Sequence, residues 1–206
     1  MIVAAHQTML APQEAPLPYD AEVEYLESTG TQYFIIQAPG SIVRAVERFM
    51  YTNVTQKQGR ALWGGVPGNL DVYCNGGAQL ASAWGGSYRS SDWSALNLDC
   101  TVDTNGTAKT VVWTNNGTSA TKTVSYASVG GYGQTLHIMQ ADNTPNAIMR
   151  LWFSRAYDSA GNALLDLQPV RVGSGACAVG YLFDRVSGTL FGNAGTGAFT
   201  IGPDKT

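Results

Sequence analysis

From residue 21 onward the chain consists of short segments in which apolar and polar residues alternate, separated by clusters of Gly, Asn, Asp and Ser. A period of two, in runs rich in β-branched and aromatic residues, is typical of strands that bury one face. Since no segment keeps a helical period, we predict an all-β fold with two antiparallel sheets in a sandwich or jelly roll. The segments expected to form strands are residues 23–27, 31–37, 41–51, 61–65, 70–74, 79–84, 95–103, 108–114, 119–126, 135–140, 149–158, 163–170, 181–184 and 189–191.

Turn residues at two places predict how neighbouring strands are joined. Asn115-Asn116-Gly117 lies between two alternating segments, and an Asn-Gly pair in that position is a strong hairpin signal. The sequence DSAGN at 158–162 predicts a second turn between two strands. In the strand before that second turn, strict alternation places Leu151, Phe153 and Tyr157 on one face.

Composition and charge narrow the range of partners. Of the 206 residues, 44% are hydrophobic and only 13% are charged, and the net charge is −3. No basic stripe is present, so we do not expect nucleic acid as a partner. No apolar run approaches the roughly 18 residues that a membrane-spanning helix requires, so we do not expect a membrane partner either.

Residues 1–20 differ from the rest of the chain. Pro12, Pro16 and Pro18 do not permit a regular helix or a central strand there. We predict an extended arm over residues 1–20, either loose or docked on a partner, followed by one domain over residues 21–206. The arm lacks the positive region and long apolar core of a signal peptide. We therefore expect synthesis in the cytoplasm and arrival at a virion or extracellular surface through lysis or particle assembly.

The cysteines and histidines suggest neither a metal site nor a nucleophile. Cys74, Cys100 and Cys177 are widely spaced, without a CxxC motif or a nearby histidine cluster. We expect three buried thiols, with one disulfide and one odd thiol as the alternative. The chain has two histidines, His6 and His137, and no Gly-x-Ser-x-Gly motif. Hydrolase chemistry of the Ser–His type therefore has no support in the sequence.

The two ends of the predicted domain resemble a known family. The sequence LPYDAEVEYLESTGTQYF at 17–34 and the segment from LWFSRAYDSAGN to GNAGTGAFTIGPD at 151–204 resemble laminin-G-like jelly-roll domains of the concanavalin A-like superfamily. The type is similar to domains of gut bacteria, their prophages and phages. The resemblance implies a two-sheet jelly roll whose first and last strands pair, with a carbohydrate-binding heritage. The middle of the chain, residues 55–135, matches only in outline.

Three glutamates in the first predicted strand raise the question of catalysis. Glu22, Glu24 and Glu27 are similar in spacing to the Glu-x-Asp-x-x-Glu motif of β-glucanases of the same superfamily, and paired carboxylates are what a retaining glycosidase uses. In those enzymes the motif lies mid-chain on a central strand, whereas here it opens the domain. We therefore expect a solvated strand face and no enzymatic activity, with a glycoside hydrolase using Glu22 and Glu27 as the less favoured alternative.

A sugar-binding site requires an aromatic surface beside planar polar groups. That mixture occurs in DVYCNGG at 71–77 and in the Gly/Ser-rich residues 82–95, which we expect to form a loop. Core and turn packing is the alternative role for these residues. The candidate ligand-binding residues are Asp71, Tyr73, Asn75, Trp84, Tyr88, Arg89, Asp92 and Trp93.

Calcium is common in laminin-G-like domains, and the resemblance makes Asp71, Asp92 and Asp142 candidate ligands. No dense oxygen-ligand motif surrounds them in the sequence. We therefore predict neither a metal site nor a cofactor.

These observations together favour a non-catalytic jelly-roll module displayed on a phage virion, as a capsid decoration or head-fibre-like protein. Such a module would attach to a larger protein assembly through the N-terminal arm and would adhere to host or mucosal glycans. Exposed virion parts are commonly symmetric oligomers, so we expect a homo-oligomer. The alternative from a different class is a free bacterial carbohydrate-binding lectin domain, for which a secretion signal would be expected.

Overall fold

The computed structural model describes residues 16–37, 39–53, 60–65, 70–74, 79–84, 87–94, 99–108, 110–115, 118–123, 135–140 and 148–206. For residues 60–94 and 120–123 the description covers the backbone of the strands and not the side chains. Residues 1–15 of the expected arm lie outside the described residues.

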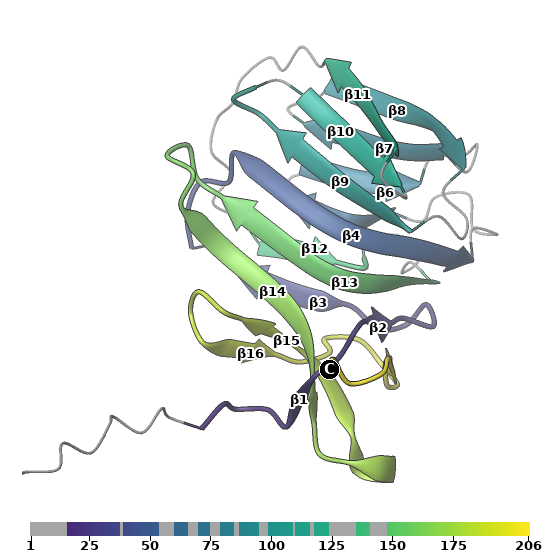
Figure 1. Ribbon diagram of the computed structural model, residues 1–206, viewed down its shortest axis with the longest axis vertical. Coiled ribbons are helices and arrows are strands. Elements are labelled where there is room, and N and C mark those ends of the chain that lie inside the picture. The colour runs from purple at the N-terminus through teal and green to yellow at the C-terminus, as the bar shows by residue number, and fades with distance from the viewer. Residues whose placement is uncertain are drawn as a thin grey trace, which may run out of the picture.

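The fold is all-β and antiparallel, with one 11-stranded sheet and one 6-stranded sheet (Figure 1). The larger sheet contains β1 (Ala21–Glu22), β2 (Leu26–Glu27), β4 (Arg44–Asn53), β9 (Cys100–Asn105), β10 (Thr110–Asn115), β11 (Thr118–Thr123), β13 (Ile148–Tyr157), β14 (Ala163–Val172), β15 (Val179–Asp184), β16 (Thr189–Phe191) and β17 (Thr200–Ile201). The smaller sheet contains β3 (Phe34–Gln37), β5 (Arg60–Gly65), β6 (Leu70–Cys74), β7 (Gln79–Trp84), β8 (Ser87–Ser94) and β12 (Thr135–Ile138). A short 3₁₀ turn, η1 (Gly175–Cys177), is the one helical element in the described part of the chain.

Strands far apart in sequence are neighbours in the larger sheet. Its order is β11-β10-β9-β4-β13-β14-β15-β16, so β4 lies between two strands from later in the chain. The smaller sheet runs β3-β12-β5-β6-β7-β8. The described residues include no helix long and apolar enough to cross a membrane.

The opening and closing segments of the domain pair with each other, as expected. β2 pairs with β17, matching Leu26 with Ile201, and Val23 forms an isolated bridge with Asp204. β1 pairs with β14, and Figure 1 shows the C-terminus beside β1 and β2. Pairing begins before residue 21, because the amide of Asp20 donates to the carbonyl of Arg171 and the ring of Tyr19 lies 5.0 Å from that of Phe183.

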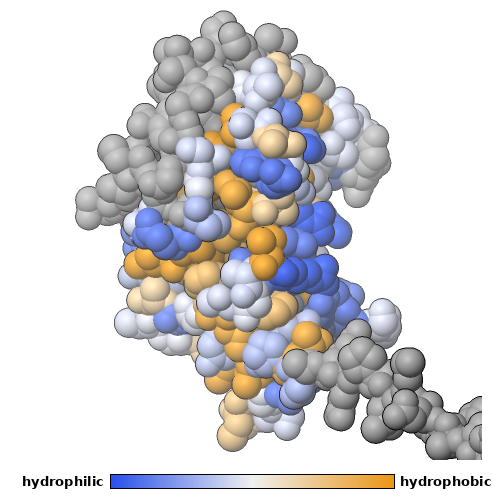
Figure 2. Space-filling model, turned by 90° about the vertical axis from the view of Figure 1, so that its left-hand side faces the viewer, coloured by the Kyte–Doolittle hydropathy of each residue, from blue (hydrophilic) through white to orange (hydrophobic). Residues whose placement is uncertain are grey.

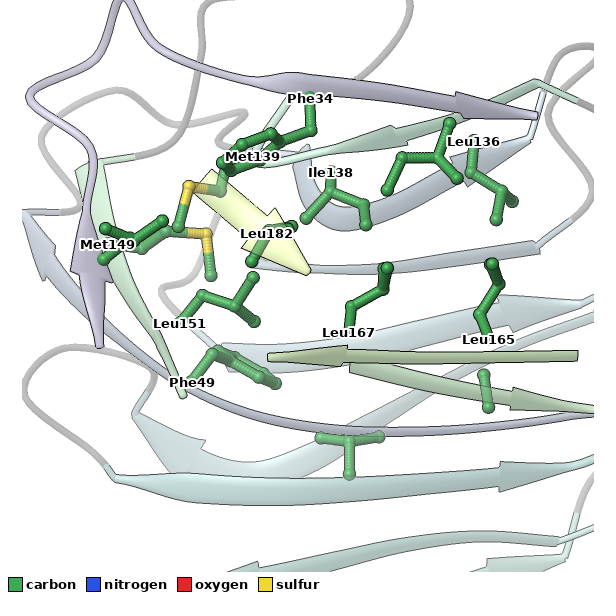
Figure 3. Packing of buried hydrophobic residues seen from close by; sticks show 14 of the residues in the cluster. Phe34, Phe49, Leu136, Ile138, Met139, Met149, Leu151, Leu165, Leu167 and Leu182 are labelled. Carbon is green, nitrogen blue, oxygen red and sulfur yellow. The ribbon is translucent and has the colours of Figure 1, made fainter. Parts of the chain in front are cut away.

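Buried side chains from both sheets meet in a common core (Figure 3). Leu136 and Ile138 of the smaller sheet lie opposite Leu165, Leu167 and Leu151 of the larger sheet. Each fully buried aliphatic or aromatic side chain contributes about 1.5–3 kcal/mol relative to exposure. The core therefore holds the two sheets against each other.

Two acidic side chains are buried in the described part of the chain, Glu47 and Asp184, and Glu47 lies on the core side of its strand. Glu47 of β4 has no exposed surface and points to the same side as Ala45 and Phe49, which are also buried. Within the described part of the chain, neither carboxyl oxygen of Glu47 has a hydrogen-bond partner. Loss of water raises the pKa of the Glu47 carboxyl well above its usual 4.5, and the charge of Asp103 raises it further.

The strand pairing expected at both predicted turns is confirmed. β10 and β11 form an antiparallel pair that ends with Asn115 opposite Thr118, which is the predicted hairpin pairing, while residues 116–117 lie outside the described residues. The DSAGN segment connects β13 to β14, and the Asp158 amide donates to the Asn162 carbonyl. Gly161 in this turn has φ +85°, a conformation that glycine adopts without strain.

Four local predictions are wrong. Residues 82–95 are not a loop, because the end of β7 and all of β8 occupy residues 82–84 and 87–94. The first predicted strand, residues 23–27, is not continuous: Val23 forms an isolated bridge, a bend follows at Glu24, and the strand β2 covers only Leu26–Glu27. Leu151 is buried while Phe153 and Tyr157 are partly exposed, because the register of β13 against β4 shifts between Leu151 and Phe153. Cys177 is exposed, in contrast to the buried Cys100.

Candidate binding face

Four arginines on the outer side of the larger sheet each lie between a carboxylate and an aromatic ring. Arg44 and Arg48 come from β4, and Arg150 and Arg155 come from β13. We call this surface the arginine–aromatic face. It comprises these arginines, the carboxylates Asp103, Asp99, Glu27 and Asp166, and the rings of Tyr157, Trp152, Tyr25 and Phe153.

Each of the two β4 arginines makes a bidentate ion pair with an aspartate of the neighbouring segment. Asp103 lies in β9, and Asp99 directly precedes that strand. Arg44 Nε and Nη2 donate to the Asp103 carboxylate at 2.9 and 2.6 Å. Arg48 donates in the same way to Asp99 at 2.9 and 2.7 Å. This fork geometry fixes the plane of each guanidinium as well as its position. The hydrogen bonds to Asp103 and Asp99 also raise the pKa of the two guanidinium groups, which stay charged.

An aromatic ring from a neighbouring segment lies beside each of these guanidinium groups. The guanidinium carbon of Arg44 lies 5.2 Å from the ring centre of Tyr157, and that of Arg48 lies 5.0 Å from Trp152. Such contacts contribute about 0.5–1 kcal/mol each at exposed sites. The ring contacts therefore restrict the position of each guanidinium group in addition to its carboxylate partner.

The β13 arginines repeat the arrangement. Arg150 Nε donates to Glu27 at 2.8 Å, and its guanidinium carbon lies 4.5 Å from the ring centre of Tyr25. Tyr25 in turn meets Trp152 edge-on, with ring centres 5.7 Å apart. The rings and arginines of β13, β2 and β4 thus form one connected surface.

Arg155 extends this surface toward β14. Its Nε donates to Asp166 at 2.8 Å, and its guanidinium carbon lies 4.6 Å from the ring centre of Phe153.

Strand alternation and one bulge explain how the sequence builds this face. In β4, Arg44, Val46 and Arg48 alternate with buried residues, so they point away from the core. In β13 the register shift leaves Trp152 and Phe153 together opposite Arg48. A bulge of this kind adds one residue to a strand and redirects side chains, which here brings two consecutive rings to the outer side.

A pocket of about 270 Å³ lies at the Arg44–Tyr157 end of the face. Its walls come from the start of β4, the turn after β9 and the turn between β13 and β14. The lining residues are Val43, Arg44, Asn105, Thr107, Tyr157, Asp158, Ser159, Ala160 and Gly161.

Backbone hydrogen bonds join the three walls of this pocket. The Val43 amide donates to the Tyr157 carbonyl, and the Val43 carbonyl accepts from Gly106, both at 2.8 Å. The side-chain oxygen of Asn105 accepts from the amide of Ala108 at 2.9 Å. Because the walls are fixed to each other, the pocket exists before any ligand binds.

Asp158 shapes the turn that forms the third wall. Its Oδ1 accepts from the amides of Ala160 and Asn162, and its Oδ2 accepts from the Asn162 side chain. These hydrogen bonds, that of the Asn162 side chain first, lower the pKa of Asp158, so the carboxylate is ionised at neutral pH.

Figure 2 views the molecule from the side on which the β13–β14 turn lies in Figure 1. Apolar and strongly hydrophilic residues adjoin one another across the middle of the part drawn in colour. Ligand sites commonly combine apolar surface with a few fixed polar groups, and this side of the molecule offers both.

The three glutamates of the opening segment do not form a joint site. Glu22 makes an ion pair with Arg185, Glu27 makes one with Arg150, and Glu24 is exposed. The expected solvated face is therefore wrong for Glu22 and Glu27. Partial burial favours a higher pKa for Glu22, but the hydrogen bond and charge of Arg185 outweigh it and the pKa is lowered.

The residues expected to bind sugar lie on three strands of the smaller sheet. Asp71 and Tyr73 are in β6, Trp84 is in β7, and Tyr88, Arg89, Asp92 and Trp93 are in β8. The register places Asp71, Ala83 and Tyr88 in one row across the three strands. Asn75 lies outside the described residues. A binding role for these residues stays a prediction.

The arginine–aromatic face was not predicted, although a signal was present. Arg44 and Arg48 are four residues apart in one expected strand, and Arg150 and Arg155 flank two consecutive aromatic residues in another. Two strands carrying spaced arginines and rings indicate a paired outer face only if they are neighbours. That pairing, between β4 and β13, is a property of the fold.

Comparison with protein-family models, curated proteins and solved structures finds no match to this chain. In the residues that the structure describes, no group of three or more His, Cys, Asp and Glu side chains is arranged to hold a metal ion. The candidate site therefore rests on the geometry of the arginine–aromatic face and its pocket.

Proposed function

We propose that this chain is a non-catalytic jelly-roll module that binds glycans through the outer side of its larger sheet. The observation that carries the proposal is the arginine–aromatic face, in which four guanidinium groups are held between carboxylates and rings. Rings offer apolar surface to the C–H faces of a sugar, and fixed guanidinium groups offer donors to its hydroxyls. The resemblance of both chain ends to concanavalin A-like domains, whose first and last strands pair, agrees with this proposal.

The carboxylates favour a neutral ligand surface over an anion-binding one. Each arginine of the face has its own carboxylate, so the four positive charges are balanced by four negative ones. A face built for nucleic acid or a polyanion would carry an excess of positive charge. The balanced pairs leave hydrogen-bonding groups in place without a strong net field.

We also propose that the module is displayed on a phage virion. Support comes from the resemblance to phage and prophage domains and from the Pro-rich arm. In Figure 1 the described start of the chain lies at the end of the molecule opposite to β8 and β11. An arm anchored in a particle would therefore hold those strands outward.

Retention on a mucin-coated surface tests the glycan proposal. We expect the full chain to bind and Trp152→Ala to weaken binding several-fold, because that ring holds Arg48 and meets Tyr25. Tyr181→Ala is the matched control, since it removes a partly exposed ring of the same sheet from β15. Equal loss in both variants, or no retention of the full chain, would contradict the proposal.

Light scattering of the chain with and without residues 1–15 tests the role of the arm. The deletion ends before Tyr19 and Asp20, because these residues already contact the domain. We expect an oligomer that becomes monomeric on deletion. A monomer in both forms would overturn self-assembly through the arm.

A further inference from the structure

We propose that the pocket at the end of the arginine–aromatic face binds one neutral hexopyranose residue of a glycan, and that it rejects sialylated ends. The inference rests on the proposed glycan-binding function and names the position and class of the ligand. It concerns the pocket between the start of β4, the turn after β9 and the β13–β14 turn.

The size of the pocket fits a single sugar ring. Its volume is about 270 Å³, below the roughly 300–1,000 Å³ of pockets that take drug-sized ligands. The three walls are tied by the hydrogen bonds of Val43 and Gly106. A fixed small pocket suits a rigid ring, since neither partner has to be ordered on binding.

The lining has the groups that a pyranose requires. The ring of Tyr157 supplies apolar surface for sugar C–H groups. The side chains of Thr107 and Ser159 carry hydroxyls, which can donate and accept. Asn105 uses its oxygen for the Ala108 amide, and no described residue accepts a hydrogen bond from its amide nitrogen, which is the group we assign to a sugar hydroxyl.

The charges around the pocket disfavour an anion. Arg44 is the one cationic residue among the described residues of the lining, and both of its described hydrogen bonds go to Asp103. Asp158 adds a second carboxylate, whose oxygens are occupied by the turn. Among the described residues, one guanidinium against two carboxylates leaves a net negative charge, which repels a sialic acid carboxylate or a phosphate.

A glycan array with matched pairs, each glycan printed with and without a terminal sialic acid, tests the ligand class. Three proteins are compared: the full chain, Ala160→Trp and Val186→Trp. Ala160 is an exposed residue of the pocket wall, so a tryptophan there fills the pocket without entering the core. Val186 is 49% exposed in the turn between β15 and β16, so Val186→Trp controls for adding a surface ring. Thermal unfolding of each variant confirms that it is folded.

We expect binding to neutral-ended glycans, weakened at least tenfold by Ala160→Trp and unchanged by Val186→Trp. Neutral methyl hexopyranosides should compete at millimolar concentration and shift amide signals of residues 105–107 and 157–161 in NMR spectra. Glycan binding that Ala160→Trp leaves intact would overturn the pocket while the proposed function stands. Binding to sialylated ends alone would overturn the ligand class, and an array without any bound glycan would overturn both.

Discussion

Strand β4 carries arginines on its outer face and a glutamate on its inner face, and the surroundings of these side chains differ in exposure and in hydrogen bonding. Arg44 and Arg48 each have a carboxylate at bonding distance and a ring alongside, with 42% of each side chain exposed. Glu47, between them in sequence, is fully buried without a hydrogen-bond partner in the described part of the chain.

The stability of the fold depends more on the buried core than on the ion pairs of the outer face. Exposed ion pairs contribute little to stability, typically below about 1 kcal/mol, so the outer pairs mainly fix side-chain geometry. A buried carboxyl without partners opposes folding by roughly 1–3 kcal/mol even when it is protonated. The ion pairs of the outer face thus fix side-chain positions and add little to the free energy of unfolding. On the inner face, burial of the Glu47 carboxyl lowers the free energy of unfolding, and the apolar packing around Phe49 and Leu151 offsets this loss.

Glu47→Met should give the largest effect. The variant removes the unpartnered carboxyl and keeps the length of the side chain, so we expect the free energy of unfolding to rise by about 2 kcal/mol at pH 7. Urea denaturation measures this quantity. Glu24→Met, at an exposed position, is the control and should change it by less than about 0.5 kcal/mol. A Glu47→Met protein less stable than the wild type would mean that the carboxyl has a stabilising partner.

The advantage of Glu47→Met should depend on pH. The folded-state pKa of Glu47 is raised above 4.5, so the proton-linked stability is fully present below pH 4.5 and is lost as pH rises toward the folded pKa. The gap in the free energy of unfolding between variant and wild type should therefore widen as the pH rises from 5 to 7. Denaturation curves at three pH values check the slope. A constant gap would show that Glu47 does not titrate on unfolding.

A double-mutant cycle of Arg48→Gln and Asp99→Asn should show a smaller effect. We expect a coupling of about 0.5–1 kcal/mol at low salt, because the pair is bidentate but more than a third exposed. The coupling should fall in 1 M NaCl through screening. A salt-independent coupling above about 2 kcal/mol would mean that the outer face is more deeply desolvated than its exposure indicates.

Arg44→Lys should have the smallest effect on stability. Lysine keeps the charge beside Asp103 but cannot form the two parallel hydrogen bonds. We expect a loss of about 0.5 kcal/mol in the free energy of unfolding. If the pocket binds a sugar, its affinity should fall more than stability does, since Arg44 lines the pocket. If Arg44→Lys and the wild type had equal stability and equal affinity, the bidentate hydrogen bonds of Arg44 to Asp103 would have no role in either.

The strands were largely predictable because alternation is a local property. β6 and β7 have the bounds expected from sequence, 70–74 and 79–84, and the β10–β11 hairpin forms at its Asn-Gly signal. β8 was missed because Ser, Arg and Asp in SYRSSDWS have the composition of a loop. In that strand the pairing with β7 outweighs intrinsic preference.

The candidate binding face depends on contacts that local patterns do not encode. Arg48 meets Trp152 only because β4 pairs with β13 and a bulge follows Leu151. The burial of Glu47 was also missed, since a glutamate in an alternating strand indicates a solvent-facing position. Both features require the register between segments about a hundred residues apart, which a single sequence does not supply.

The pairing of the first strands with the last ones has a consequence for synthesis of the protein on the ribosome. β1 and β2 are made early, but their partners β14 and β17 are among the last strands to emerge. Until then Val23 and Leu26, which are fully buried in the finished fold, have no cover, and the backbone of β2 lacks its neighbours. An incomplete chain would present an unpaired apolar strand, which is a template for aggregation. We therefore expect the yield of native protein to depend on completing the final strand, with removal of residues 199–206 causing insolubility during expression rather than a modest loss of stability.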